Sequence, residues 1–466
     1  MRALSHYYLN YQRNMEDIVV AQKQFFNSNT TKDLAFRIGQ LQKLETVLRA
    51  NEELLHEAIY RDFKKSSFEN YTTEISLLYH DIKEALKNIK KWSAKKKVKT
   101  NWANLPGKSY IIPEPLGTSL IIGAWNYPFQ LSIAPAIAAI AAGNTVILNP
   151  SELPINSSNV MAKLINENFD PQFFKVIEGG IAETTELLEQ KFDKIFFTGS
   201  VPVGKIVYQA AAKNLIPVTL ELGGKSPAII TADCHLKICV KRLIWAKYLN
   251  AGQTCIAPDY VVVHKKVKDE FLKLAKKEIE QSNFLIEEDN YVQIINDKNL
   301  QRLIALIDAD KTYTGGEYHL ENRVLEPTIL TNISFDDKIM QDEIFGPILP
   351  VLEYDDLDKV ISQIKERPKP LSCYVFTADK KVKSKILNEI SFGGGAVNDA
   401  LMHITNSNMG FGGVGASGIG SYHGEHGFKT FSHYKGILEK PTWFEPNFKY
   451  YPHTKNKLKW IKRLIG

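Results

Sequence analysis

The segment from Leu131 to Leu148 reads Leu-Ser-Ile-Ala-Pro-Ala-Ile-Ala-Ala-Ile-Ala-Ala-Gly-Asn-Thr-Val-Ile-Leu and is the longest apolar stretch of the 466-residue chain. Pro135 and the turn residues Gly143-Asn144-Thr145 interrupt it, so it is too broken for a membrane span. The pattern instead predicts a helix that starts near Pro128, a turn at Gly143, and a strand from Thr145 to Leu148.

The same alternation of apolar runs and helical segments continues on both sides of this unit. Five strands are predicted, at Ser119–Ile122, Thr145–Leu148, Phe173–Ile177, Lys194–Thr198 and Val218–Leu222. The connections are long enough for crossover helices, which we expect from Pro128 to Gly143 and around Asn156–Asn166, Ala182–Gln190 and Val203–Ala212. Strands joined in this way form a parallel sheet, so the fold class is α/β with a doubly wound, Rossmann-like arrangement.

The segments before and after this region have patterns of their own. Residues Asp33 to Ala94 carry apolar positions at helical spacing, which predicts a helical N-terminal layer. From Glu221 onward a second α/β set is expected, with strands at Val261–Val263, Leu349–Leu352 and Tyr374–Phe376.

Two short segments carry residue types that suit covalent chemistry. Asn250 to Tyr260, Asn-Ala-Gly-Gln-Thr-Cys-Ile-Ala-Pro-Asp-Tyr, places Cys255 in a turn-rich context, where Gly252 and the polar Gln253-Thr254 pair favour chain reversal and exposure of the thiol. Glu221, 34 residues upstream in Leu-Glu-Leu-Gly-Gly-Lys-Ser-Pro, ends an apolar run before two glycines. Cys255 is therefore a candidate nucleophile and Glu221 a candidate base. An inert buried thiol is the alternative for Cys255.

Together with Trp-Asn-Tyr-Pro-Phe at residues 125–129 and Glu-Ile-Phe-Gly-Pro at residues 343–347, these segments resemble the aldehyde dehydrogenase superfamily, and specifically its short class 3 branch. The resemblance runs from about Tyr71 to His433. It implies NAD(P)-dependent oxidation of medium- to long-chain aliphatic or aromatic aldehydes to carboxylic acids, through a thiohemiacetal and a thioester on Cys255.

The resemblance also assigns roles residue by residue. Cys255, Glu221 and Asn126 are expected to be catalytic, with the Asn126 amide stabilising the oxyanion. Cofactor contacts are expected from Trp125, Glu152, Gly199, Ser200, Glu343 and Phe345, and an aromatic substrate channel from Tyr71, Trp245 and Tyr248. The family usually has Lys where this chain has Asn149, so NAD is the expected preferred cofactor, with NADP also accepted.

Several motifs have a simpler interpretation. Asn126 could cap the helix entered at Pro128. Residues 199–205, Gly-Ser-Val-Pro-Val-Gly-Lys, resemble part of a phosphate-binding P-loop, but Ile206 stands where that loop requires Ser or Thr. Residues 410–415 match Gly-x-Gly-x-x-Gly, yet no helix follows, so they are not a dinucleotide-binding fingerprint.

Three other functions compete with the aldehyde dehydrogenase hypothesis. A CoA-acylating or acyl-phosphate-reducing enzyme of the same fold needs no hydrolytic base, which the carboxylate of Glu221 argues against. A cofactor-free cysteine hydrolase needs a histidine partner, and no Cys/His signature is present. A binding protein without catalysis is disfavoured by the complete set of Asn, Glu and Cys.

Charge and cysteine usage indicate where the protein works. From Lys440 to Gly466 the net charge is +6, and the remaining 51 basic and 51 acidic residues cancel, so a nucleic-acid partner is not expected. No signal peptide is visible in Met1–Asp17, and the four cysteines show no metal-ligand spacing, so a cytoplasmic protein without a metal is expected.

The chain is expected to divide into three regions. Residues 1–95 and 115–220 form a helical layer plus the NAD-binding domain, residues 221–420 the catalytic domain, and residues 96–114 and 421–466 oligomerisation strands and a basic tail. By resemblance, the protein forms a homodimer. In the tail, Leu458, Trp460, Ile461, Leu464 and Ile465 alternate with basic residues, a pattern suited to peripheral contact with an anionic membrane. Docking on the partner subunit, or a frayed end, is the alternative.

Overall fold

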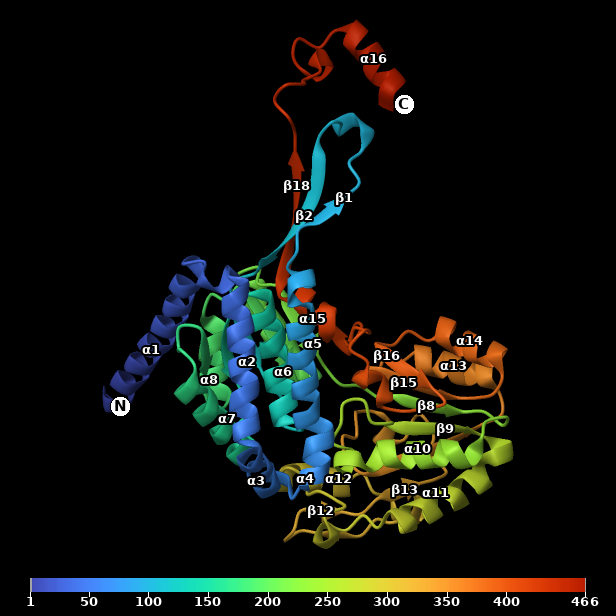
Figure 1. Ribbon diagram of the computed structural model, residues 1–466. Helices are drawn as coiled ribbons and strands as arrows, with labels where there is room; N and C mark the ends of the chain where they lie inside the picture. The colour runs from blue at the N-terminus through green and yellow to red at the C-terminus, as the bar shows by residue number, and fades with distance from the viewer. Residues whose placement is uncertain (1, 466) are drawn as a thin grey trace.

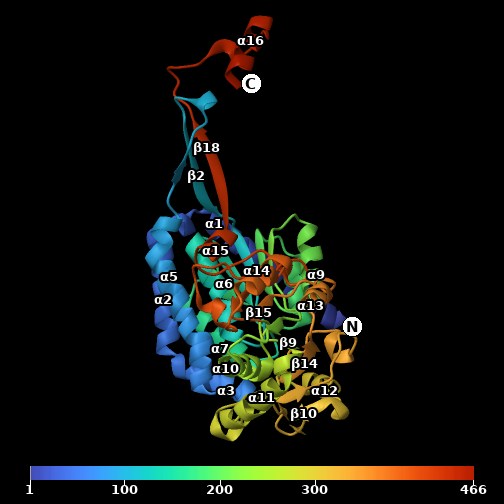
Figure 2. The ribbon, with the colours of Figure 1, turned by 90° about the vertical axis from the view of Figure 1, so that its right-hand side faces the viewer.

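Two mainly parallel β-sheets, each covered by helices on both faces, form the body of the molecule (Figure 1). The computed structural model describes the backbone of residues 2–465 and the side chains of residues 15–463. A third, smaller sheet projects from this body and carries the C-terminal segment, as the two perpendicular views show (Figure 2).

The first large sheet has six strands in the order β17-β7-β6-β3-β4-β5, all parallel except β17. Its strands are β3 (Thr118–Ile122), β4 (Thr145–Asn149), β5 (Phe174–Val176), β6 (Lys194–Thr198), β7 (Val218–Glu221) and β17 (Gly418–Ile419). The crossover helices are α6 (Pro128–Ala142), α7 (Ile155–Asn168), α8 (Ile181–Glu189) and α9 (Val201–Ala212). The five strands and four helices expected from the sequence are all present.

Alternate side chains of the first sheet enter different cores, as expected for a sheet buried on both faces. Leu120 packs in the core that includes residues of α8 and α9, whereas its neighbour Ile121 packs with α6 and the N-terminal helices. The helix α1 (Arg2–Asn27), which the sequence pattern did not predict, joins the first of these cores through Met15 and Val19.

The N-terminal helices lie against the opposite face of this sheet. They are α2 (Leu34–Ala50), α3 (Glu52–Phe63), α4 (Ser67–Asn70), the π-helical segment η2 (Tyr71–Ile75) and α5 (Ser76–Trp92). Their buried apolar residues, Leu41, Leu44, Leu48, Ile75, Leu78, Ile82 and Ile89, share one core with α6. The predicted helical layer is therefore confirmed.

The second large sheet has seven strands in the order β10-β13-β14-β9-β8-β15-β16. They are β8 (Pro227–Ile230), β9 (Tyr260–His264), β10 (Thr312–Thr314), β13 (Thr328–Leu330), β14 (Ile348–Tyr354), β15 (Ser372–Phe376) and β16 (Gly394–Val397). Its helices are α10 (Leu236–Tyr248), α11 (Lys268–Ser282), α12 (Asp297–Ile304), α13 (Leu357–Lys365) and α14 (Lys380–Glu389). The three predicted strands correspond to β9, β14 and β15.

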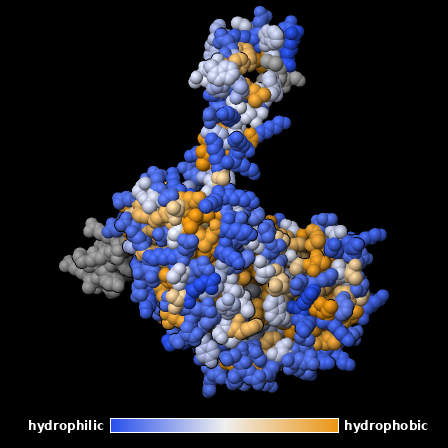
Figure 3. All heavy atoms as spheres, viewed as in Figure 1, coloured by the Kyte–Doolittle hydropathy of each residue, from blue (hydrophilic) through white to orange (hydrophobic). Residues whose placement is uncertain are grey.

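The projecting sheet is antiparallel and contains β1 (Lys96–Val98), β2 (Lys108–Pro115) and β18 (Ser432–Glu439), with β2 in the middle. The short helix α15 (Gly424–Thr430) precedes β18, and α16 (Lys455–Ile465) ends the described chain beyond the tip of the sheet (Figure 1). Apolar side chains stand among hydrophilic ones on this projection (Figure 3). Those most exposed include Trp443 and Tyr451, and Leu458 and Trp460 of α16 are also exposed.

The sequence pattern places Leu464 and Ile465 on the apolar side of the tail, but their side chains lie outside the described residues. Among the helices between residues 2 and 465, none is long and apolar enough to cross a membrane.

Candidate active site

The carboxyl ends of the parallel strands in the first sheet meet at one edge, where ligands bind in open α/β sheets. β3 leads there into Trp125 and Asn126, β6 into Gly199 and Ser200, and β7 ends at Glu221 itself. The segment that carries Cys255 reaches the same place from the second sheet, between α10 and β9.

Cys255 follows a turn whose backbone is strained. Asn250, Ala251 and Gly252 have φ angles of 54°, 50° and 69°, three consecutive residues in the left-handed region. A side chain on Gly252 would collide with the carbonyl of Gly346, so only glycine fits there. Such backbone strain persists only where surrounding contacts over-determine it, and it is common at functional sites.

Gln253 supplies several of those contacts. Its Nε2 donates to the carbonyl of Gln293 at 3.1 Å, and its Oε1 accepts from the N–H of Ile295 at 3.0 Å. Gln253 and Thr254 are buried and Cys255 is partly buried. The Cys255 thiol is therefore less exposed than the polar Gln253-Thr254 pair suggested, because both of these neighbouring side chains are buried.

Asn126 is tied directly to the Cys255 loop. Its Nδ2 donates to the carbonyl of Gln253 at 3.0 Å, and the side chain is 3% exposed. The N-cap residue of α6 is Tyr127, whose side chain makes no capping bond, and the first free N–H groups of the helix donate to Glu74. Capping therefore does not explain Asn126, whose amide keeps a second N–H for another acceptor.

Glu221 is a buried carboxyl group with no hydrogen-bond partner for either oxygen among the described residues. Burial raises its pKa well above the usual value for Glu. A carboxyl group held in this way accepts a proton more readily than an exposed one, which suits a general base or acid.

The thiol of Cys255 is held in its neutral form. Burial, and secondarily the carboxyl groups of Glu343 and Glu221, raises its pKa to about 12. Glu221 is thus close enough to influence the thiol electrostatically. Since the thiolate is the nucleophile, attack by Cys255 requires a group that takes up its proton.

Glu343 and Phe345 approach from the second sheet. The Glu343 carboxylate fills the space above Gly223, where any side chain would collide with it. Burial, and secondarily the charge of Asp259, raises the pKa of Glu343 to about 8. Phe345 has a φ of 49° and contacts Trp125 edge-to-face, with ring centroids 5.2 Å apart.

Gly199 and Ser200 lie at the start of α9. The N–H of Gly199 donates to the carbonyl of Glu221 at 3.0 Å, so it is not free for a phosphate group. Ser200 precedes the helix without a side-chain capping bond. The anion-binding potential expected here therefore resides in Ser200 and the first turn of α9.

Asn149 ends β4 and Glu152 follows it, and the two residues have different environments. Glu152 is exposed beside Gly180, whereas Asn149 is 1% exposed. The Nδ2 of Asn149 donates to Ile177 O at 2.9 Å, and its Oδ1 accepts from the hydroxyl of Thr184 at 2.7 Å. Asn149 thus serves to join β4 to the segment around α8.

The three expected channel residues do not share one environment. Tyr71 and Trp245 are 41% and 44% exposed. Tyr248 is fully buried, its ring lies 5.5 Å from that of Phe284, and its hydroxyl donates to Thr328 O at 3.1 Å. The structure places Tyr248 in the core, which corrects its assignment to a channel.

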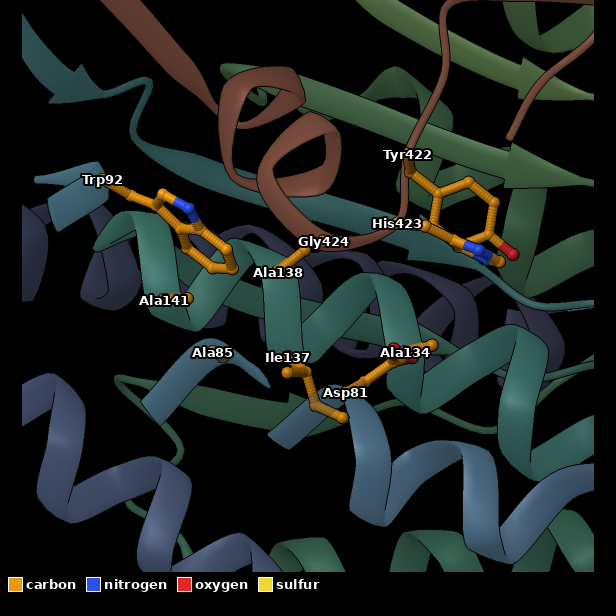
Figure 4. A pocket seen from close by; sticks show the side chains of 10 residues that line it. All are labelled: Asp81, Ala85, Trp92, Ala134, Ile137, Ala138, Ala141, Tyr422, His423 and Gly424. Atoms are coloured by element: carbon orange, nitrogen blue, oxygen red, sulfur yellow. The ribbon is translucent and has the colours of Figure 1, made fainter. Parts of the chain in front are cut away.

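A groove between α5, α6 and the segment before α15 was missed by the sequence analysis. Figure 4 shows Trp92, Ala138 and Ile137 along it, and Tyr422, His423 and Asp81 are its polar residues. Burial raises the pKa of Asp81 to about 7 and lowers that of His423 to about 4. His423 has a left-handed φ of 78° and lies next to Gly424. An unusual backbone conformation beside a glycine is the local feature of the sequence that could have indicated this groove.

The groove and the Cys255 site are neighbours. The charges of Glu221 and Cys255 raise the pKa of Tyr422, in addition to the effect of burial. Tyr422 also exchanges two backbone hydrogen bonds with Phe411, at 2.9 and 2.8 Å, within the glycine-rich segment. A side chain on Gly410 would come within 2.8 Å of the His426 ring, which accounts for glycine there.

Comparison with known proteins agrees with this geometry. The model of the aldehyde dehydrogenase family matches residues 3–437. The chain is 48% identical over 444 residues to 4,4'-diaponeurosporen-aldehyde dehydrogenase of Staphylococcus aureus, covering 94% of this chain and 96% of the relative. It is 43% identical to aldehyde dehydrogenase family 3 member A2 of Pongo abelii, over 96% and 93% of the two chains.

Two further similarities bear on assembly and fold. The chain is 42% identical to the "aldehyde dehydrogenase, dimeric NADP-preferring" of Mus musculus, covering 91% of this chain and 94% of the relative. The solved structure of the substrate-bound state of Staphylococcus aureus AldH superposes with a TM-score of 0.95 at 46% identity, covering 97% of this chain and 99% of that one.

Proposed function

Because the chain belongs to the aldehyde dehydrogenase family and is an NAD(P)-dependent enzyme that oxidises aldehydes to carboxylic acids, we propose that Cys255, Asn126 and Glu221 carry out this reaction. The observation that carries the proposal is the hydrogen bond from Asn126 to Gln253, which fixes an amide donor two residues from the thiol. Glu221, buried and unpartnered, completes the set.

The residues around the thiol fit a bound dinucleotide. Gly223 leaves room for the Glu343 carboxylate, which can accept from ribose hydroxyls, and Phe345 with Trp125 offers a flat apolar wall. Ser200 and the start of α9 can receive the pyrophosphate. Glu152 is exposed where an adenosine ribose would approach. When bound, NAD(P) supplies the hydride acceptor.

The reaction then divides among the protein's own groups. The proton of the Cys255 thiol passes to solvent water, the sulfur adds to the aldehyde carbon, and the carbonyl oxygen becomes an oxyanion that the Asn126 amide and the Cys255 N–H stabilise. Loss of hydride from the thiohemiacetal carbon leaves a thioester. Glu221 takes a proton from water, the water oxygen attacks the thioester carbon, and the C–S bond breaks. The carboxylic acid leaves, and the proton held by Glu221 returns to the sulfur of Cys255, which restores the thiol.

We propose medium- to long-chain aliphatic or aromatic aldehydes as substrates. The apolar lining of the groove beside Tyr422, formed by Ala85, Ala134, Ile137, Ala138 and Ala141, supports this substrate class. The test is NADH production over a series of aldehydes of increasing chain length. A kcat/KM that rises with chain length supports the proposal, and one that peaks at acetaldehyde contradicts it.

We propose that the enzyme prefers NAD to NADP. A 2′-phosphate needs a cationic partner, and Asn149, which stands where the family usually has Lys, is neutral, buried and hydrogen-bonded through both its amide nitrogen and its amide oxygen. The mouse relative is named NADP-preferring. The test for this chain is a comparison of kcat/KM with NAD and with NADP.

We further propose a cytoplasmic homodimer that uses the projecting sheet. Exposed apolar side chains on β1 and β18, Val98, Tyr434 and Leu438, supply an uncovered surface there, and one relative is named dimeric. In this arrangement residues 2–95 and 115–220 bind the cofactor, residues 221–420 supply the thiol, and the remaining strands join the subunits. Light scattering of the purified protein tests the dimer.

The basic tail supports a reversible contact with an anionic membrane surface. On α16, Leu458 and Trp460 are about half exposed, and five basic residues share the same helix. Each such residue near an anionic surface contributes about 1 kcal/mol. The competing arrangement is docking of α16 on the partner subunit. A vesicle-binding measurement distinguishes membrane contact from this docking.

A further inference from the structure

A fully buried ion pair lies directly behind Asn126. The Nζ of Lys65 is 3.2 Å from Oε1 of Glu74, and both side chains are 0% exposed. Neither residue has a role in the reaction described above. A buried pair of this kind is seldom a net source of stability, because removing both charges from water costs about as much as their attraction returns.

Lys65 and Glu74 form hydrogen bonds to the two ends of the segment from Asn126 to Gln130. Glu74 Oε2 accepts from the N–H groups of Phe129 and Gln130, at 2.9 and 3.2 Å, in the first turn of α6. Lys65 Nζ donates to the carbonyl of Asn126 at 3.5 Å. The ammonium group also lies 4.5 Å from the ring centroid of Tyr127.

The carbonyl of Asn126 is shared with the turn before Cys255. Asn250 Nδ2 donates to this carbonyl at 3.0 Å and to that of Gln253 at 3.1 Å. The N–H of Asn250 donates to Glu69 Oε1 at 3.0 Å. The backbone carbonyl of Asn126 therefore accepts one hydrogen bond from Lys65 and another from Asn250, which belongs to the loop that carries the thiol.

We propose that Lys65 and Glu74 are positioning residues that fix the backbone of Asn126 so that its amide is aimed at the oxyanion formed on the aldehyde. This inference rests on the proposed role of Asn126 as the oxyanion donor. The direction of a donor matters because misplacement by about 1 Å can cost about a hundredfold in rate.

A double-mutant cycle tests the proposal. The first variant combines Lys65→Met with Glu74→Gln, which removes both charges together so that neither is left buried alone. The second is Asn126→Ala, and the third combines all three changes. The measured quantities are the rate constant of the NADH burst after rapid mixing with aldehyde, the Kd for NAD and the thermal midpoint.

The neutral-pair variant should lower the burst rate constant by about 10- to 100-fold with an unchanged Kd for NAD. In the Asn126→Ala background the same substitutions should change the burst by less than about twofold, because the group they position is gone. If the two effects multiply instead, Lys65 and Glu74 act independently of Asn126 and the proposal is wrong.

Two further variants complete the experiment. Lys194→Met removes another buried ammonium group, which donates to Thr219 Oγ1 at 2.7 Å at the far end of β6, and should leave the burst rate constant near that of the wild type. Lys65→Arg keeps the charge but changes the donor geometry. Lys65→Arg should lower the burst rate constant only when Asn126 is present. This variant tests the proposal if the variant with the neutral pair does not fold. If Asn126→Ala alone leaves the burst unchanged, the oxyanion assignment itself fails.

Discussion

Replacement of Glu221 with Gln separates the two halves of the reaction. The substitution keeps the shape of the side chain but removes its ability to take a proton from water. Hydride transfer does not need that ability, so the first turnover should proceed and the thioester should persist. Rapid mixing with NAD and aldehyde should give a burst close to one NADH per active site, followed by a slow steady rate.

The size of the effect follows from the environment of the carboxyl group. General-base catalysis contributes about 10²- to 10⁴-fold, so the steady rate should fall by that factor while the burst amplitude stays. Both oxygens of Glu221 already lack partners, and an unpaired buried amide costs about 1–3 kcal/mol at most. The variant should therefore fold, with a modestly lower thermal midpoint.

A matched control is available on α8. Glu186 is also a buried glutamate with an unpartnered carboxyl oxygen, and burial raises its pKa as well. Glu186→Gln should cycle at the rate of the wild type. Steady turnover of Glu221→Gln at the wild-type rate would refute the assignment of Glu221 as the hydrolytic base.

Further predictions concern the nucleophile, pH, cofactor and tail. Cys255→Ala should give neither a burst nor turnover in the same rapid-mixing assay, and a residual burst would exclude Cys255 as the nucleophile. Because burial raises the pKa of Glu221, its carboxyl group is protonated at pH values where an exposed Glu is ionised, so steady turnover should rise with pH through that raised pKa, and this dependence should disappear in Glu221→Gln. The kcat/KM should be higher with NAD than with NADP, and Asn149→Lys should raise kcat/KM for NADP by roughly one to two powers of ten, because a charge-assisted bond to the 2′-phosphate contributes about 1.5–3 kcal/mol; equal use of both cofactors by the native protein contradicts the preference. The full chain should sediment with anionic vesicles at low salt, and deletion of residues after Tyr451 should abolish this; a protein that stays in the supernatant assigns α16 a structural role.

The sequence predicted the first sheet closely because buried parallel strands leave strong local signals. β3, β4 and β6 are buried along their whole length, and Gly143 ends α6 in the left-handed region, where glycine is favoured. α1 was not predicted, because the apolar residues that its described part adds to the cores, which include Met15, Ile18, Val19 and Phe25, are interleaved with polar residues such as the buried Gln22.

The environment of the candidate site could be predicted less well, because it depends on contacts between distant segments. Gln253 is buried and hydrogen-bonded to Gln293 and Ile295, about forty residues away, so its polarity was a poor guide to the exposure of the neighbouring Cys255 thiol. Tyr248 was misplaced for a similar reason, since Thr328 satisfies its hydroxyl inside the core. The local composition around Gln253 and Tyr248 does not reveal these distant hydrogen-bond partners.

The same long-range contacts explain why the chemistry belongs to neither sheet alone. Asn126 and Glu221 are placed by the first sheet, whereas Cys255 and Glu343 arrive on segments of the second. The bonds from Asn126 to Gln253 and from Asn250 to Asn126 cross between these units, and both end on backbone carbonyls. A backbone acceptor cannot be removed by substituting its own side chain. The relative position of the thiol and the amide donor is therefore sensitive to the donating side chains of Asn126 and Asn250 and to the groups that orient them.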